Sequence, residues 1–378
     1  MSRSRSPLNA QRPPTIIDVA SAAGMSVSTV SRVIRAREDV SDDTRRRVQR
    51  VMVDLGYRPS AVARALVAGF SKTIALLVSD IANPAYPQLA KSIEREASRH
   101  GYALAICNTE DDPVEAVALA QRMMDQGVEG MVHASVGLEE ERILAVVGDL
   151  RRIVFANRRP RSDGVSYIGS DDHEGGILLA RHLLATGHRR IGFVAGPNWA
   201  SNSADRMEGM ASVVHEPSAE LLVAQGDFSM ESGASAVRGW LDSGHSPTAI
   251  VGVNDVVALG AMRELRAHDN ARRIAVAGFD DTELAGSDII GLTSVAQHIG
   301  RMGEQAVQVL LRQLTGRTQP PVRTILRPTL RVRATTAALC GPFAEVGRLP
   351  SGSCLADGEE PPAWAPTPHP TLATLGDC

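Results

Sequence analysis

The chain has 378 residues, of which 43% are hydrophobic, and a formal net charge of −3. This length exceeds one ordinary domain and predicts two or three folded units. No run approaches the roughly 18 uninterrupted apolar residues of a membrane span, and no apolar stretch follows the basic N-terminus as in a signal peptide. These patterns favour a cytoplasmic protein without a membrane partner. The four cysteines lack metal-ligand spacing, so we expect no metal site, disulfide framework or cofactor.

The charge is distributed unevenly along the chain. Residues 1–66 contain twelve arginines and no lysine against six acidic residues, which gives them a formal charge of +6 and leaves −9 for the remainder. A basic head on an acidic body indicates an anionic partner for the head. Because charge runs usually form solvated faces, charge alone does not establish a nucleic-acid partner.

Three short helices are predicted in the basic head. The first is capped by Thr15 and ends at Gly24. The second begins at Ser26 and runs through "SVSTVSRVI", and the third begins at Ser41 and ends at Gly56. Two short helices joined by a tight turn and followed by a third are typical of a helix-turn-helix.

Serine, threonine and valine dominate the second helix, although they are mediocre helix formers. A helix that enters a major groove about 12 Å wide needs small outward side chains and one long hydrogen-bonding arm. We therefore expect Val30 and Val33 to face the core. The expected base contacts are Val27, Ser28 and Arg32, and the expected phosphate contacts are Ser26, Thr29 and Ser31. The alternative is a surface helix-turn-helix that binds no DNA.

Apolar runs alternate with helical patterns through the rest of the chain. "TIALLVS", "ALAIC" and "RIVFA" with the helical "YPQLAKSIEREASRHG" form one set, and "RIGFVAG", "TAIVGVN" and "RIAVAGFDD" with "DVVALGAMRELRAH" form a second. The alternation predicts parallel α/β units. Two similar halves predict two Rossmann-like lobes with a cleft between the carboxyl ends of their strands.

The segments "TIIDVASAAGMSVSTVSRVI" and "VSDDTRRRVQRVMVDLGYRPSAVARAL" closely resemble the DNA-binding head of the lactose-repressor (LacI/GalR) family of bacterial transcription regulators. The resemblance continues through "ALLVSDIANPAY", "DRMEG", "NDVVALGAMREL", "AGFDDTELA" and "LTSVAQ". It implies a repressor that binds double-stranded operator DNA as a homodimer and responds to a small effector. It also implies an all-α head joined to an α/β effector domain like that of periplasmic binding proteins.

The implied organisation has five parts. They are a disordered leader (1–13), a helix-turn-helix domain (14–58), a hinge helix and linker (59–71), a two-lobed effector-binding and dimerisation domain (72–336) and a disordered tail (337–378). In the family, the hinge helix at "PSAVARAL" orders on DNA and inserts leucines into the minor groove. An apolar wedge between small residues suits that role, although Leu66 as a core residue of a linker is the alternative. The resemblance completes the DNA contacts with Thr15, Tyr57, Ser60, Ala63, Arg64 and Leu66.

The resemblance also implies an effector site between the lobes. Seven residues carry over by motif: Tyr86, Asn157, Asp171, Arg206, Phe228, Asn254 and Asp280. Carboxylates, amides and a guanidinium around an aromatic ring suit a sugar, a sugar derivative or another small polar ligand. We expect Arg206 and Asp280 to serve the ligand rather than the protein core. Asp255 is expected to cap its helix, and simple capping by Asp171 and core packing by Phe228 remain alternatives.

Four features depart from the family pattern. Asn157 stands where an aspartate is common and Ala85 where an aromatic residue is common, which indicates an unusual ligand. Asp39 occupies a position near the DNA backbone that is often asparagine, where a carboxylate would repel phosphate. The stretch 210–226 is about three residues shorter than the pattern, and residues 337–378 have no counterpart in it.

Two other classes of protein fit the sequence less well. Exported solute-binding proteins share the body fold but lack a basic helix-turn-helix. An enzyme would need more than Asp280 and Asp281, because adjacent carboxylates of one turn rarely both face a substrate. No nucleophile with a base, phosphate loop or metal cluster accompanies them, so the sequence predicts no enzymatic activity.

Overall fold

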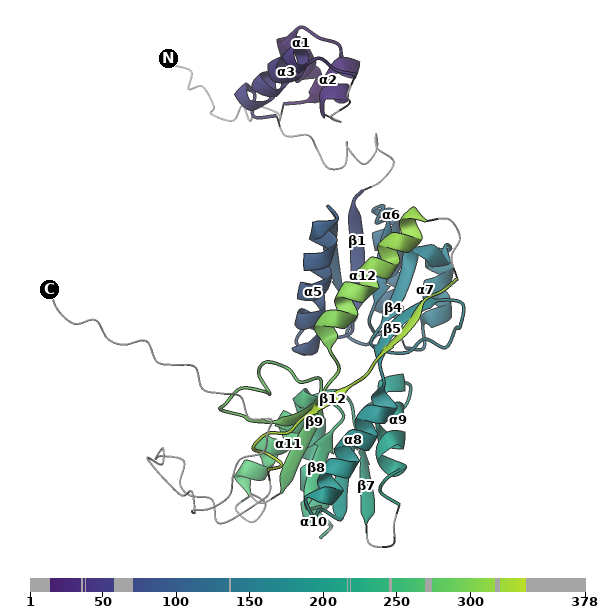
Figure 1. Ribbon diagram of the computed structural model, residues 1–378, viewed down its shortest axis with the longest axis vertical. Helices are drawn as coiled ribbons and strands as arrows, with labels where there is room; N and C mark the ends of the chain where they lie inside the picture. The colour runs from purple at the N-terminus through teal and green to yellow at the C-terminus, as the bar shows by residue number, and fades with distance from the viewer. Residues whose placement is uncertain are drawn as a thin grey trace, which may run out of the picture. The chain divides into compact units, whose positions relative to one another are not determined.

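The computed structural model describes residues 14–34, 37, 39–57, 71–135, 137–215, 217, 219–244, 247–268, 274–316 and 320–337. They form a helical head and two α/β lobes (Figure 1). The predicted hinge contacts Ser60, Ala63, Arg64 and Leu66 lie outside the described residues.

The head consists of α1 (Ile16–Ala23), α2 (Val27–Ile34) and α3 (Asp42–Asp54). Thr15 closes a capping box at the start of α1, and Gly24 ends that helix in the left-handed conformation at φ 64°. One apolar cluster holds the three helices together, and its buried members are Val19, Ala20, Ala23, Val30, Val33 and Val48.

The first lobe is built on a parallel sheet with the strand order β11-β5-β4-β3-β1-β2. Its strands are β1 (Thr73–Val78), β2 (Ala103–Asn108), β3 (Gly130–His133), β4 (Ile153–Ala156), β5 (Ser166–Ser170) and β11 (Arg323–Leu326). Its helices are α5 (Ala85–Arg99), α6 (Pro113–Asp125), α7 (Glu140–Val147), the short η1 (Leu150–Arg152) and α12 (Ile299–Thr315).

The second lobe repeats this plan with the strand order β12-β10-β9-β8-β6-β7, in which only β12 runs antiparallel to its neighbour. Its strands are β6 (Arg190–Ala195), β7 (Glu220–Gln225), β8 (Ala249–Gly252), β9 (Ala275–Phe279), β10 (Thr293–Ala296) and β12 (Thr329–Arg331). Its helices are α8 (Asp172–Ala185), α9 (Ser201–Ala211), α10 (Met230–Asp242) and α11 (Asp255–Ala267).

The lobes are not two consecutive halves of the chain. The chain leaves the first lobe after β5, returns after β10 to form α12 and β11, and ends in the second lobe with β12. Helix α12 packs against α5 and buries Met302, Val307 and Leu310 in the core of the first lobe. Several connections therefore run between the two lobes, as Figure 1 shows.

Candidate functional site

Helix α2 of the head separates an apolar face from a polar one. Val30 and Val33 are buried in the core, whereas Val27, Ser28 and Arg32 are exposed. The sequence predicts this division for a helix that presents small side chains and one long arm to a groove.

Hydroxyl groups order the N-terminal ends of α1 and α2. The Ser26 hydroxyl accepts a hydrogen bond from the backbone N–H of Thr29 at 3.1 Å, and its Oγ lies 2.7 Å from that of Ser28. The Thr15 hydroxyl donates to the Asp18 carboxylate at 2.7 Å. These side chains therefore sit at helix N-termini, whose backbone N–H groups commonly bind phosphates.

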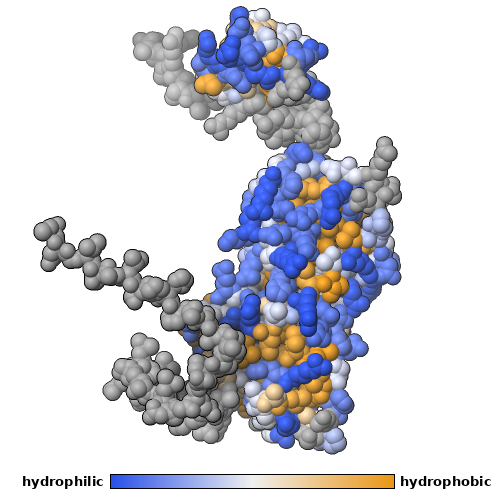
Figure 2. All heavy atoms as spheres, viewed as in Figure 1, coloured by the Kyte–Doolittle hydropathy of each residue, from blue (hydrophilic) through white to orange (hydrophobic). Residues whose placement is uncertain are grey.

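The other predicted contacts of the head differ in exposure. Ser31 and Tyr57 are half-buried, and Tyr57 packs against the apolar core. Arg32 is 59% exposed, and its Nη1 lies 3.4 Å from Oδ2 of Asp39. The surface of the head is mainly hydrophilic, with small apolar spots (Figure 2), and its exposed apolar side chains include Ile17, Val27 and Val53.

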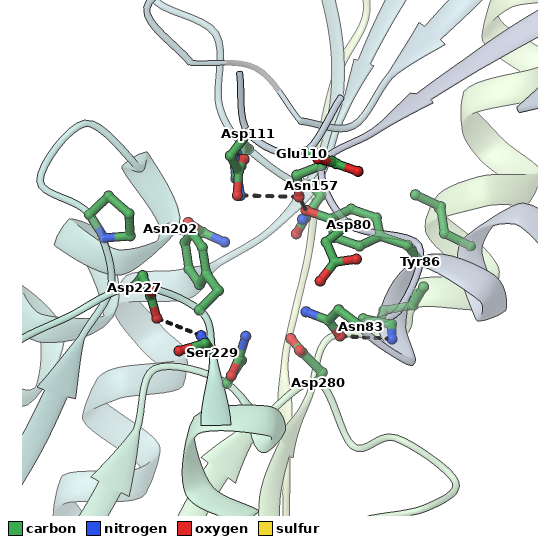
Figure 3. Close-up of a pocket in the computed structure, with 18 of the residues that line it drawn as sticks. Asp80, Asn83, Tyr86, Glu110, Asp111, Asn157, Asn202, Asp227, Ser229 and Asp280 are labelled. Carbon is green, nitrogen blue, oxygen red and sulfur yellow. Dashed lines mark hydrogen bonds and ion pairs between the residues drawn. The ribbon is translucent and has the colours of Figure 1, made fainter. Parts of the chain in front are cut away.

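Residues of both lobes line one cavity of about 440 Å³ (Figure 3). In the first lobe, Asp80 follows β1, Asp111 follows β2 and Arg158 follows β4. In the second, Asn254 follows β8 and Asp280 follows β9. The carboxyl ends of parallel strands are where open α/β sheets bind ligands. Other lining residues are Ser79, Asn83, Ala85, Tyr86, Leu89, Glu110, Asn157, Pro197, Trp199, Asn202, Arg206, Asp227, Phe228, Ser229, Ile299 and Met302.

The structure brings six of the seven predicted effector residues to this cavity: Tyr86, Asn157, Arg206, Phe228, Asn254 and Asp280. Asp171 is not among the lining residues. Its carboxylate accepts a hydrogen bond from the backbone N–H of Glu174 at 2.9 Å and caps α8. The expectation that Asp171 binds the effector is therefore replaced by the capping alternative.

Arg206 is almost completely buried, with 1% of its surface exposed. Its Nε donates to Asp172 at 2.8 Å, its Nη1 donates to the carbonyl of Val253, and its guanidinium lies 4.6 Å from the centre of the Phe279 ring. Its Nη2 has no hydrogen-bond partner and lies 3.9 Å from Asp280. Arg206 thus serves the core through Asp172, contrary to the sequence-based expectation, and keeps one buried donor for the cavity.

Asp280 faces Arg206 across the floor of the cavity. Its backbone has φ 105°, a conformation that side chains rarely adopt, and Gln297 donates to its carboxylate at 3.1 Å. Burial raises the pKa of Asp280 to about 8, although Arg206 opposes the shift. The group is therefore largely a neutral acid at pH 7, able to donate as well as accept a hydrogen bond.

Two neighbouring polar residues at the start of α11 differ in role from the sequence-based expectation for the helix cap. Asn254, not Asp255, is the N-cap, because its side-chain oxygen accepts from the backbone N–H of Val257 at 2.8 Å. Asp255 is buried and accepts hydrogen bonds from Thr282 and Ser294. The expected cap at Asp255 is wrong, and its carboxylate fixes the turn that carries Asp280.

Arg158 lines the cavity but was not predicted, although it directly follows the predicted Asn157 in the sequence. Only 2% of its surface is exposed. Its Nη1 donates to Asp111 at 2.6 Å, and its guanidinium lies 4.9 Å from the rings of both Trp199 and Phe228. Because both rings belong to the second lobe, Arg158 joins the lobes. Its Nε has no hydrogen-bond partner.

A second contact between the lobes lies beside Arg158. Arg159 donates to both oxygens of Asp205 at 2.8 and 2.9 Å, and its backbone N–H donates to Ser201 at 2.8 Å. No sequence signal pairs residues so far apart in the chain. The segment after β4 therefore connects the first lobe to α9 of the second.

Residues 15–60 match the bacterial regulatory proteins of the lacI family, and residues 180–336 match the periplasmic binding protein-like domain. The chain is 34% identical over 334 residues to the HTH-type transcriptional regulator DegA of Bacillus subtilis (strain 168), covering 86% of this chain and 98% of DegA. This chain belongs to the lacI family. That finding confirms the predicted family, which consists of DNA-binding transcription regulators and not of enzymes.

Solved structures of lacI-family proteins share the fold. The lac repressor dimer bound to operator and the anti-inducer ONPF aligns with a TM-score of 0.76 and 29% identity, covering 86% of this chain and all of that one. The complex of the regulator CelR with cellobiose aligns with a TM-score of 0.64 and 30% identity, covering 85% and 99%. The predicted fold class, a helical head with two periplasmic-binding-protein-like lobes, is confirmed.

The described residues contain no group of three or more His, Cys, Asp or Glu side chains that could hold a metal ion. In the same part of the chain, no helix is long and apolar enough to cross a membrane.

Proposed function

We propose that this lacI-family regulator is a repressor whose operator affinity is set by a small polar effector, bound between the lobes. The observation that carries the proposal is the buried Nη2 of Arg206, which has no hydrogen-bond partner, in a cavity that both lobes line. A buried donor without a partner costs about 1–3 kcal/mol, which a bound acceptor would offset. A ligand that bridges the lobes would favour their closure.

The charges around the cavity limit the class of effector. Its lining acidic residues are Asp80, Glu110, Asp111, Asp227 and the largely neutral Asp280, and its cations are Arg158 and Arg206. Each guanidinium already has a carboxylate partner, Asp111 for Arg158 and Asp172 for Arg206. An anionic ligand would therefore enter a site that is already acidic, whereas the hydroxyl and amino groups of a ligand could donate hydrogen bonds to these side chains. We therefore propose a neutral sugar or an amino sugar and not a sugar phosphate. The similar transcriptional regulator CelR, solved with cellobiose, supports a carbohydrate.

A thermal-shift screen tests the cavity. Each sugar scaffold is supplied in three forms, neutral, amino-substituted and phosphorylated, with cellobiose included. A ligand at 100 times its dissociation constant raises the free energy of unfolding by about 2.7 kcal/mol, so a binder should raise Tm by several degrees. We expect shifts from neutral or amino forms that the Asp280→Ala variant, which has no polar side-chain atom at this position, loses. Stabilisation only by phosphorylated forms would contradict the proposed class.

The head is proposed to read a near-palindromic duplex, because a twofold dimer presents two copies of α2 about one helical turn apart. The lac repressor, solved as a dimer bound to operator, supports this arrangement. Arg32→Ala should weaken binding to a duplex selected from a random library by about 1–3 kcal/mol and relax selectivity at one base pair. Gel shifts on the selected and mutated duplexes measure this effect. Recovery of only asymmetric or single-stranded sites would contradict the proposal.

Ligand and DNA are proposed to communicate through the segment that leaves the first lobe. Strand β1 begins at Thr73, directly after the hinge and linker, so movement of this lobe moves the hinge. In the proposed mechanism, closure around the ligand changes whether two Leu66 side chains meet in one minor groove. A coupling of this kind is typically about 1–3 kcal/mol and acts equally in both directions.

A further inference from the structure

The carboxylate of Asp39 lies beside the arginine that is proposed to read a base. Its Oδ2 is 3.4 Å from Nη1 of Arg32, and the two side chains are 58% and 59% exposed. Arg32 belongs to α2, and Asp39 to the loop between α2 and α3. The pair therefore lies on the surface of the head, outside its apolar core.

The negative charge of Asp39 should lower the affinity of this surface for DNA. Each cation that neutralises a phosphate adds to affinity for any sequence, so a carboxylate beside Arg32 reduces general attraction to DNA. The pair also adds little to the stability of the head, since exposed ion pairs contribute about 0–1 kcal/mol to the free energy of unfolding. A role in sequence selection accounts for both observations.

The hydrogen-bonding capacity of arginine allows such a role. The guanidinium has five N–H donors in a planar fork and no acceptor. When Nη1 faces Asp39, the edge formed by Nη2 and Nε stays available, and two adjacent donors are what the O6 and N7 acceptors of guanine require. The carboxylate would also oppose rotation of Arg32 toward a phosphate, because that rotation breaks the pair.

We infer that Asp39 is a positioning residue that holds Arg32 for base reading and so exchanges general DNA affinity for sequence selectivity. The inference rests on the proposed DNA-binding function of α2. It gives a role to the carboxylate that departs from the family pattern at this position.

The test uses the full chain and a duplex selected from a random library. Asp39→Asn is compared with Asp43→Asn, which removes the same charge from the same head but from a carboxylate paired with Arg46 at 2.6 Å. Both variants are also made in the Arg32→Ala background. Gel shifts measure binding to the selected duplex, to duplexes altered at one base pair at a time, which locate the pair where Arg32→Ala relaxes selectivity, and to random DNA.

Both single variants should bind random DNA more tightly than the wild type. Asp39→Asn alone should lose about twofold to fivefold of the discrimination at that base pair, the factor that an exposed ion pair can supply. Asp39→Glu, which keeps the carboxylate, should retain most of the discrimination that Asp39→Asn loses. In the Arg32→Ala background, Asp39→Asn and Asp43→Asn should have equal effects.

Equal discrimination in Asp39→Asn and Asp43→Asn would overturn the inference, as would an effect of Asp39→Asn that persists without Arg32. Neither result would contradict the proposal that Arg32 reads a base. Unchanged discrimination in Arg32→Ala itself would show instead that the proposed base reading is wrong, and the inference would fall with it. Because both aspartates are exposed, unchanged Tm values should show that the variants are folded.

Discussion

Replacing Arg206 by alanine should both abolish the effector response and lower the free energy of unfolding by about 3–5 kcal/mol. The second effect follows from Asp172, whose carboxylate is 5% exposed and pairs with Arg206 at 2.8 Å. Without the guanidinium, this buried carboxylate has no cation to offset its desolvation. Burial already raises the pKa of Asp172, and Arg206 is the main group that opposes the shift.

Urea unfolding followed by tryptophan fluorescence measures the loss, since Trp199 and Trp240 both belong to the second lobe. The double variant Asp172→Asn, Arg206→Ala should recover part of the stability, because the remaining buried group is neutral. It should not recover effector binding. If Arg206→Ala unfolds at the same urea concentration as the wild type, the buried pair is not a structural element of the lobe.

The Asp280→Asn variant should change the pH dependence of stability. The pKa of Asp280 is raised by burial from 3.8 to about 8 in the folded chain, so the folded state retains a proton that the unfolded state has released. Stability of the wild type is then lost as the pH rises between these two values. Asparagine does not titrate, so the variant is spared this loss.

The expected result is a difference in Tm, variant minus wild type, that grows from pH 5 to about pH 8 and then levels. Asp255, whose pKa burial raises to about 6, titrates in both proteins, and their comparison largely cancels its contribution. A Tm difference that stays constant from pH 5 to pH 9 would show that Asp280 titrates at its ordinary pKa.

Local signals explain why much of the fold was predictable. Thr15 and Gly24 define the ends of α1 through capping and a left-handed turn, which depend only on adjacent residues. The strands could be recognised as continuous apolar runs, because strands of a parallel sheet are buried on both faces. Asn254 and Asp280 directly follow such runs, and the resemblance to the family assigned both to the effector site that lines the cavity.

The remaining features depend on contacts between distant segments. Helix α12 returns to the first lobe because it packs against α5, and strand β11 because it pairs with β5. No pattern of adjacent residues predicts these contacts. The partner of Arg206 is 34 residues away, and that of Arg158 is 47 residues away. The choice between Asn254 and Asp255 as the cap of α11 depends on backbone geometry, because both residue types are good N-caps.

The central claim is that one ligand in the cavity controls operator affinity. The most direct test is fluorescence anisotropy with the selected duplex, with and without the sugar found in the thermal-shift screen, paired with calorimetry of that sugar with and without the duplex. Operator affinity should change by about 5- to 150-fold, and sugar affinity should change by the same factor. A sugar that binds the wild type but not Asp280→Ala, yet leaves operator affinity unchanged, would contradict this control of operator affinity.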